Sequence, residues 1–225
     1  MNKRKSMEQV VYETIKTAIL AREIAPGTQL VENTISDKLK VSRTPIRNAI
    51  KKLQEEGLVT MVPNRGAFVM QPTRAEIMQA FEFRTELECM AVPLALQHVT
   101  KQDIAELKEM MIGEREAYKE KDILTYITIN KAFHLFLAKR TGNKFLIETL
   151  DTLLRKINIY LILYGVFNYV SLDEVTNLQD HERMITFIEQ KEGEALQYLI
   201  RMHLQTSLHE LEIDKLQYKA LEDIL

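Results

Sequence analysis

Residues 41–50 read VSRTPIRNAI, a stretch in which two arginines, Arg43 and Arg47, stand four positions apart. Apolar residues occur at helical spacing here and just beyond, at Ile46, Ile50 and Leu53. This pattern predicts an amphipathic helix whose apolar side faces a small core. Residues four apart share one side of a helix, so both arginines lie on the opposite side.

The ends of this helix are also marked in the sequence. Ser42 or Thr44 can cap its N-terminus, and Pro45 is tolerated in the first turn, where N–H groups have no intrahelical partner. Gly57 follows the helix and suits a C-terminal cap. We therefore expect a helix that begins between residues 42 and 45 and ends before Gly57.

The flanking segments complete a small domain. Helical spacing and β-prone runs predict helices over 7–22 and 32–39, then, after the central helix, short strands over 58–62 and 67–70. The turn PNRG between the strands places Arg65 at the tip of a hairpin. Residues 1–72 are therefore predicted to form a winged helix-turn-helix DNA-binding domain.

The position of the arginines suits DNA. In a helix-turn-helix, the N-terminal end of the second helix of the motif enters the major groove, where arginine can bond guanine O6 and N7. Ser42 and Thr44 can reach phosphate or base edges, and a helix N-terminus favours a phosphate. The alternative is a solvated basic face, which does not explain why the arginines cluster at the insertion end or why Arg65 adds to them.

Residues 73–225 predict a second, all-helical domain for effector binding and dimerisation. Only one proline and four glycines interrupt this part of the chain. The predicted helices span 74–98, 101–119, 122–140, 143–164, 171–190 and 193–218. The fold class is therefore mainly α, with an N-terminal winged helix-turn-helix and a C-terminal helical bundle.

Charge and composition narrow the class of protein. The net charge is −2, but residues 1–72 carry +5 and residues 73–225 carry −7. A basic front is expected if only that part meets a polyanion, although chance segregation of solvated charges is the alternative. One cysteine, no secretory signal and no apolar run near 20 residues predict a soluble, cytoplasmic protein without a membrane segment.

The front domain resembles the GntR family of bacterial transcription regulators. The motifs PGTQL, VSRTPIRNAI, LQEEGLV and PNRGAFV occur in the family's order and spacing. The resemblance implies that recognition-helix and wing residues contact double-stranded DNA. Asn33 stands where some members hold an arginine, which leaves its contact open. The implied DNA-binding residues are Asn33, Ser42, Arg43, Thr44, Arg47, Arg65 and Gly66.

Histidines in the back half form a candidate metal site. Asn130 and His134 are four apart on one predicted helix, and His181 and His203 lie on two others. Ligands from several helices can converge inside a bundle, and imidazole suits zinc, nickel, copper or iron. Taken alone the pattern is weak, because scattered helical histidines are more often polar core or surface residues.

The back half resembles the FCD-type effector domain of the fatty-acid-responsive (FadR) branch of the same family. FEFRTELE, NKAFHLFLAKRTGN, DHERMI and GEALQYLIRMHL carry this resemblance. It implies that Asn130, His134, His181 and His203 bind a divalent metal, zinc or nickel. Because asparagine is neutral where some members have aspartate, we expect weaker metal binding and a stronger pull on an anionic effector.

Two further features of the back half have open roles. The resemblance implies that Arg84 contacts an effector carboxylate, but a salt bridge to Glu88 one turn later is equally consistent with the spacing. The stretch INIYLILYGVFNYV is rich in aromatic residues. These aromatic residues could belong to the core, line the effector pocket or form a dimer contact. They are Tyr160, Tyr164, Phe167 and Tyr169.

These features predict a homodimeric transcription regulator, a repressor that binds a palindromic operator and senses a small carboxylate or sugar acid. No organic cofactor is expected. The alternative is a metal-dependent enzyme with a DNA-binding domain, in which three histidines activate water. Against it, no carboxylate is obviously placed beside the histidines as a general base, since Glu182 points about 100° away from His181 on a helix. A third reading is a winged helix for protein contacts, which would lack the steep salt dependence of DNA binding.

Overall fold

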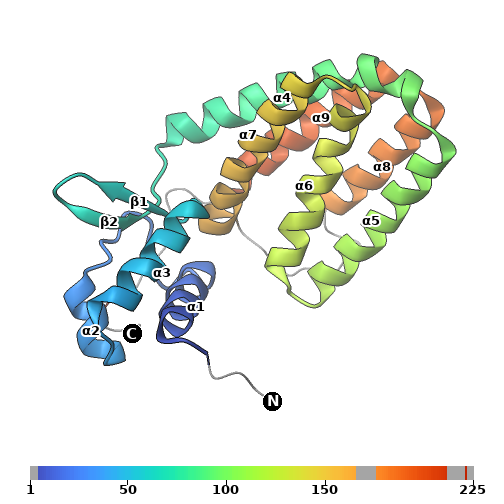
Figure 1. Cartoon of the computed structure of the whole chain (residues 1–225). Helices are drawn as coiled ribbons and strands as arrows, with labels where there is room; N and C mark the ends of the chain where they lie inside the picture. Colours follow the sequence, from blue (N-terminus) through green and yellow to red (C-terminus); the bar gives the residue numbers. More distant parts are fainter. Residues whose placement is uncertain (1–4, 166–175, 212–220, 222–225) are drawn as a thin grey trace. The chain divides into compact units, whose positions relative to one another are not determined.

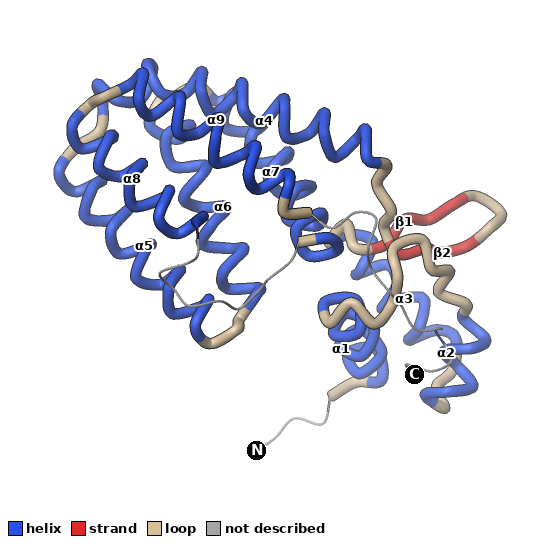
Figure 2. The backbone as a smooth tube through the Cα atoms, turned by 180° about the vertical axis from the view of Figure 1, so that it is seen from behind, coloured by secondary structure: helices blue, strands red, loops and turns tan. Residues whose placement is uncertain are grey.

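The computed structural model describes residues 5–165, 176–211 and 221 of the 225-residue chain. Its chain divides into two compact units, one that contains the first three helices and a hairpin and one that contains residues Arg74–Glu212. In the described ranges every remaining element is helical (Figures 1 and 2). The predicted fold class, mainly α with a winged helix-turn-helix and a helical bundle, is confirmed.

The first unit consists of α1 (Met7–Leu20), α2 (Glu32–Leu39), α3 (Arg43–Glu55), β1 (Val59–Val62) and β2 (Gly66–Val69). Its core is formed by aliphatic side chains of the three helices. Those of Ile15, Ile35, Ile46 and Leu53 have no exposed surface. Burial of each such side chain contributes about 1.5–3 kcal/mol, so the apolar face predicted from the 41–53 spacing is what fixes α3 against α1 and α2.

Glycines mark the chain reversals of this unit. Gly57 follows Glu56, the C-cap residue of α3, has φ +82° and donates its N–H to the Gln54 carbonyl at 2.9 Å, as expected after a helix C-terminus. Strands β1 and β2 pair antiparallel from Val59 with Val69 to Val62 with Gly66. The three residues between Val62 and Gly66 form the tip of the wing, where Gly66 has φ +95°.

The second unit contains seven helices in its described part. They are α4 (Arg74–Ala95), a short 3₁₀ helix (Leu96–His98), α5 (Lys101–Lys119), α6 (Ile123–Arg140), α7 (Lys144–Tyr164), α8 (Thr176–Gln190) and α9 (Gly193–His209). Asn143 and Asp122 cap α7 and α6 through their side chains, and Thr100 forms a capping box with Asp103 on α5. Local capping chemistry therefore explains why these helices start where they do.

Boundaries differ from expectation mainly at the end of the bundle. Helix α9 ends at His209, and Leu211 pairs with Gly165 as an isolated β-bridge, so the helix expected over 193–218 is already interrupted there. Residues 171–175 of the helix expected over 171–190 lie outside the described residues, as do Phe167 and Tyr169. Tyr160 and Tyr164 are buried in the bundle, which agrees with a core role for that end of α7.

The packing of the second unit brings five helices around one centre. Helix α4 contacts α6 and α9, α5 contacts α6 and α8, and α8 contacts α9. Figure 2 shows the helices of this unit running side by side. No helix in the described ranges combines the length and apolar composition needed to cross a membrane.

Candidate functional sites

The residues predicted to contact DNA all lie on the surface of the first unit. They belong to α2, to the start of α3 and to the wing, and each is exposed: Asn33, Ser42, Arg43, Thr44, Arg47, Arg65 and Gly66. The buried side of α3 holds Ile46, Ala49, Ile50 and Leu53. Helix α3 therefore has the two faces that the sequence predicted, one packed and one open.

The start of α3 is open to a ligand. Lys40, before it, adopts a left-handed conformation with φ +54°, which turns the chain sharply from α2 into α3. Ser42 is the N-cap, and in the described structure its side chain makes no capping hydrogen bond. The first N–H groups of a helix have no intrahelical acceptor, so a phosphate could accept from them and from the Ser42 hydroxyl.

Arg47 is held by an acid that the sequence analysis did not select. Its Nε atom lies 2.9 and 3.0 Å from the two carboxylate oxygens of Glu32, in the first turn of α2. This ion pair raises the pKa of Arg47 further, because Glu32 accepts a hydrogen bond from the guanidinium and attracts its charge. The arginine is therefore a permanent cation anchored at one of its three nitrogens.

The wing is braced by a residue of the preceding loop. Gln29 donates its side-chain amide to the Arg65 carbonyl at 2.6 Å, and the Arg65 guanidinium lies 5.2 Å from the centroid of the Phe68 ring. Asn64 and Gly66 both have positive φ, which shapes the tip. These contacts fix the backbone that presents Arg65.

A surface hollow of about 540 Å³ adjoins these residues. Its lining includes Arg47, Glu32 and Asn33 together with Gln29, Lys51 and Gly66. Gln29, Glu32 and Lys51 were missed in the sequence. Lys51 could have been found, because it lies four residues after Arg47 on the exposed side of α3.

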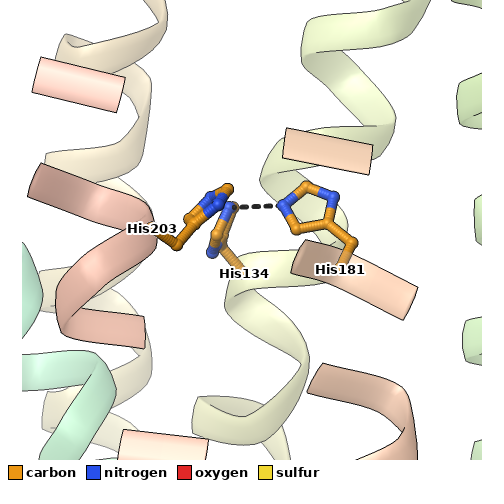
Figure 3. Close-up of side chains that lie close together, drawn as sticks. All are labelled: His134, His181 and His203. Carbon is orange, nitrogen blue, oxygen red and sulfur yellow. Dashed lines mark hydrogen bonds between the residues drawn. The ribbon is translucent and has the colours of Figure 1, made fainter. Parts of the chain in front are cut away.

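In the second unit, the three predicted histidines converge. His134 on α6, His181 on α8 and His203 on α9 are 5%, 0% and 2% exposed, and one ligand nitrogen from each lies within 4.8 Å of the others. The Nε2 atoms of His134 and His181 are 3.2 Å apart, as the dashed line in Figure 3 marks. The imidazole rings therefore meet in the interior of the bundle.

Buried carboxylates surround the histidines. His134 Nδ1 lies 2.9 Å from Glu88 on α4, and His181 Nδ1 lies 2.9 Å from Glu114 on α5. His203 Nδ1 lies 3.5 Å from Asp180 on α8 and, among the described residues, has no hydrogen-bond partner. A carboxylate on Nδ1 fixes the ring and directs Nε2 to the centre, which is how metal-binding histidines are commonly held.

The charge states in this cluster follow from burial and from Arg84. Burial and the Arg84 charge lower the pKa of His134 well below its ordinary value, so the ring is neutral near pH 7. Burial lowers the pKa of His203 to about 4. Burial alone would raise the pKa of Glu88, but His134 and Arg84 outweigh it and lower this pKa to about 2, so Glu88 is ionised.

Arg84 takes part in this cluster from α4. Its Nε donates to Glu88 at 2.6 Å, so the salt bridge considered in the sequence analysis is present. Its Nη2 atom is buried and, within the described residues, has no hydrogen-bond partner. The ion pair therefore leaves one donor of Arg84 for another acceptor.

Asn130 lies beside the histidines as well. It is buried one turn before His134 on α6, and its amide Nδ2 donates to Glu114 at 3.2 Å. Glu114 thus joins Asn130 and His181. Three buried carboxylates, Glu88, Glu114 and Asp180, therefore lie beside the histidines on three different helices, each near a histidine Nδ1 atom. The expectation of a more positive metal site, which was based on Asn130 standing in place of an aspartate, did not take these three acidic side chains into account.

Comparison with known families covers both units. Residues 7–69 match the family described as "Bacterial regulatory proteins, gntR family", and residues 79–206 match the FCD domain. The chain belongs to the gntR family of bacterial regulatory proteins. Its FCD domain accounts for more than half of the chain, in agreement with the resemblance to the FadR branch.

Two relatives that match this gntR-family chain over about nine-tenths of their length are named as transcription regulators. It is 27% identical over 205 residues to the HTH-type transcriptional repressor RspR of Escherichia coli K12, covering 91% of this chain and 89% of the relative. It is 25% identical to the E. coli regulator McbR, covering 92% and 93%. The solved structure of E. coli McbR/YncC has the same fold, with a TM-score of 0.63 and 24% identity over 92% and 97% of the two chains.

Membership in this family establishes the general activity. The protein is a DNA-binding transcription regulator with an N-terminal helix-turn-helix and an FCD domain, and its relatives are named as transcription regulators and not as enzymes. The geometry agrees, because the carboxylates nearest the histidines bind histidine Nδ1 atoms and Glu114 has no exposed surface. A general base for hydrolysis would have to reach a water molecule instead.

Proposed function

We propose that this regulator is a homodimeric repressor that binds a palindromic operator and releases it on binding a small carboxylate or sugar acid. A divalent transition metal, zinc or nickel, would be held by His134, His181 and His203, with Asn130 as a fourth ligand. The observation that carries the effector part is the convergence of three buried histidines, two of them held by carboxylates at Nδ1.

The distance between two of the histidines fits a shared ion. Zinc binds histidine nitrogen at about 2.0–2.1 Å, and two nitrogens 3.2 Å apart on one such ion subtend about 100°. With Nδ1–H donated to Glu88 and Glu114, both Nε2 atoms present lone pairs to each other. A metal ion between them would satisfy both lone pairs, and the lowered pKa of His134 disfavours a proton on that ring.

The buried charges favour a cation as well. Glu88, Glu114 and Asp180 are three buried carboxyl side chains around the imidazole rings, and Arg84 is the cation that contacts Glu88. Uncompensated buried charge is costly, and a divalent ion would balance the two carboxylates that Arg84 does not. When bound, the metal would supply positive charge that attracts an effector carboxylate.

Arg84 is the protein group proposed to bind that carboxylate. Its buried Nη2 atom can donate a hydrogen bond beyond the one that Nε makes with Glu88. The cavity beside Glu88 and His134 has a volume of only about 20 Å³, enough for about one water molecule. Effector binding therefore requires side chains of the bundle to move, and such movement could be transmitted to the DNA-binding units.

Dimerisation is proposed to use α4 and α9. These helices pack on each other through hydrogen bonds between Gln197 and Cys89, and through the Glu86–Arg201 ion pair. Most large exposed apolar side chains of the second unit lie on them: Met78, Phe83, Met90, Leu94, Tyr198 and Met202. Exposed apolar side chains gathered on two packed helices favour a symmetric contact with a second copy.

Sedimentation tests the dimer surface. Leu94→Asp should shift the protein from dimer to monomer, because it places a charge in the apolar contact. Ile112→Asp is the matched control, since Ile112 is also exposed but lies on α5. If the Leu94 variant remains a dimer, α4 is not the contact surface.

Selection of genomic fragments by the purified protein tests the operator. At near-physiological salt, sequencing of the bound fragments should reveal one short palindrome, and the adjacent genes should indicate the effector class. Enrichment of no sequence, with or without zinc, would contradict operator binding by the protein in this form. Repression is proposed because RspR is named a repressor.

Metal analysis tests the effector site separately. Zinc or nickel should co-purify stoichiometrically, or should raise the thermal midpoint when added to metal-free protein. His134→Ala should lose this effect and the response to ligand but keep operator binding, whereas His98→Ala, at an exposed histidine, should keep all three. An unchanged ligand response in His134→Ala would remove the metal site from the mechanism.

The buried free thiol of Cys89 fits the proposed cytoplasmic location.

A further inference from the structure

We propose that Glu32 is a positioning residue for DNA sequence recognition, which acts by holding the guanidinium of Arg47 through its Nε atom. This inference rests on the proposed operator contact of Arg47. It concerns an acid on the DNA-binding surface, where negative charge would ordinarily be unfavourable.

The geometry assigns the two ends of the guanidinium to different partners. Both Glu32 oxygens contact Nε, at 2.9 and 3.0 Å. In the described ranges the two terminal amino groups of Arg47 make no hydrogen bond, and the side chain is 65% exposed. Those two groups form the planar fork that can bond O6 and N7 of guanine. Glu32 therefore accepts from Nε, the one guanidinium nitrogen that is not needed when the two terminal amino groups bond guanine.

Glu32 is itself well placed for this contact. It is the first residue of α2, where the partial positive charge of the helix N-terminus stabilises a carboxylate. The N-cap, Val31, offers no side-chain oxygen to the first turn. The short connection through Lys40 and Val41 sets α2 against α3, so the carboxylate and the guanidinium meet across the helix-turn-helix.

The Glu32–Arg47 ion pair is expected to contribute little to the free energy of folding. Exposed ion pairs stabilise proteins weakly, because solvent screens them and two long side chains lose freedom. A recognition arginine gains from that same loss of freedom. If Glu32 restricts its rotamers before DNA arrives, less conformational entropy is lost on binding.

If Glu32 acted only through its charge, its removal would strengthen DNA binding. Loss of one negative charge close to phosphates should tighten binding to any DNA. Positioning predicts instead that operator binding weakens while binding to unrelated DNA does not. The sign of the change at the operator therefore separates the two explanations.

The experiment compares operator DNA with a scrambled duplex of the same length and composition, using the full-length protein at fixed salt. Glu32→Ala should weaken operator binding about 5- to 10-fold and leave scrambled binding equal or tighter. Asp37→Ala is the matched control, because it removes an exposed acid from the same helix and should preserve the ratio of the two affinities. Glu32→Gln, which keeps an oxygen acceptor for Nε, should retain more of the ratio than Glu32→Ala.

A double-mutant cycle tests whether the effect passes through Arg47. In the Arg47→Ala background, Glu32→Ala should cause no further loss of the affinity ratio. The proposal is overturned if Glu32→Ala binds the operator as tightly as the parent or more tightly, or if it lowers the ratio equally without Arg47. If the parent itself selects no operator, the proposed function fails first, and this inference fails with it.

Discussion

Two arginine–glutamate pairs in this protein have the same chemistry in opposite surroundings. Arg84 and Glu88 form an ion pair whose side chains are 3% and 5% exposed, with Nε 2.6 Å from the carboxylate. Arg47 and Glu32 form one whose side chains are 65% and 32% exposed, with Nε at 2.9 Å. The first pair adjoins the histidine cluster, and the second lies on the surface that we propose binds DNA.

The difference in burial assigns each pair a different role. Removal of one partner from a buried pair leaves a charge without solvent or counter-charge, which is strongly destabilising. An exposed pair can be broken at little cost, so its arginine can be given to a ligand. In this molecule, buried polar residues should therefore affect folding and effector response, and exposed ones should affect DNA binding.

The largest expected effect is from Glu88→Ala. It strands Arg84 and the Nδ1 atom of His134, and we expect the free energy of unfolding to fall by about 3–5 kcal/mol. Chemical denaturation followed by circular dichroism measures this. Glu86→Ala, at an exposed residue two positions earlier that pairs with Arg201, should change it by less than about 1 kcal/mol. Equal losses in both variants would show that burial is not the cause.

Glu114→Gln should weaken metal binding about 10- to 100-fold, because the carboxylate that orients His181 is replaced by a neutral amide. Titration of metal-free protein with zinc, followed by calorimetry, gives the affinity. Glu116→Gln, at an exposed position on the same helix, is the control and should bind zinc like the parent. A Glu114 variant with parental affinity would place the ion elsewhere.

Arg43→Ala should reduce operator affinity roughly 5- to 100-fold and leave the thermal midpoint unchanged, since the side chain is exposed. Fluorescence anisotropy with labelled operator measures the loss. Parental binding by this variant would remove Arg43 from the recognition surface and sharpen the assignment to Arg47.

The smallest expected effect is from Lys51→Ala. Lys51 lines the hollow next to Arg47, and we expect its exposed ammonium group to contact a phosphate. Its loss should weaken operator and scrambled DNA alike and lower the slope of log affinity against log salt by about 1. A change confined to the operator would instead make Lys51 a base-reading residue.

The sequence predicted best those features that depend on neighbouring positions. The apolar spacing of Ile46, Ile50 and Leu53 predicted the buried side of α3, and PNRG predicted the wing. The three histidines lie on separate helices, so their spacing alone gave only a weak prediction of a site, and the family resemblance strengthened it. Their convergence is a property of the packed bundle.

The partners of those histidines could not be predicted in the same way. Glu88, Glu114 and Asp180 look in sequence like other acids of amphipathic helices, and only their burial separates them from exposed ones such as Glu86 and Glu116. Burial of an acid depends on which helices pack together, and no single helix encodes that. Glu32 was missed for a related reason, since its contact with Arg47 joins two helices.

The small volume of the cavity beside Glu88 and His134 has a kinetic consequence for the proposed effector. With room for about one water molecule, it would admit the proposed organic acid only when side chains of the bundle move apart. The association rate should then stop rising at high effector concentration and reach the rate of that opening. The rate at which the proposed effector changes expression of the regulated genes would then be limited by the opening of the bundle rather than by diffusion of the effector.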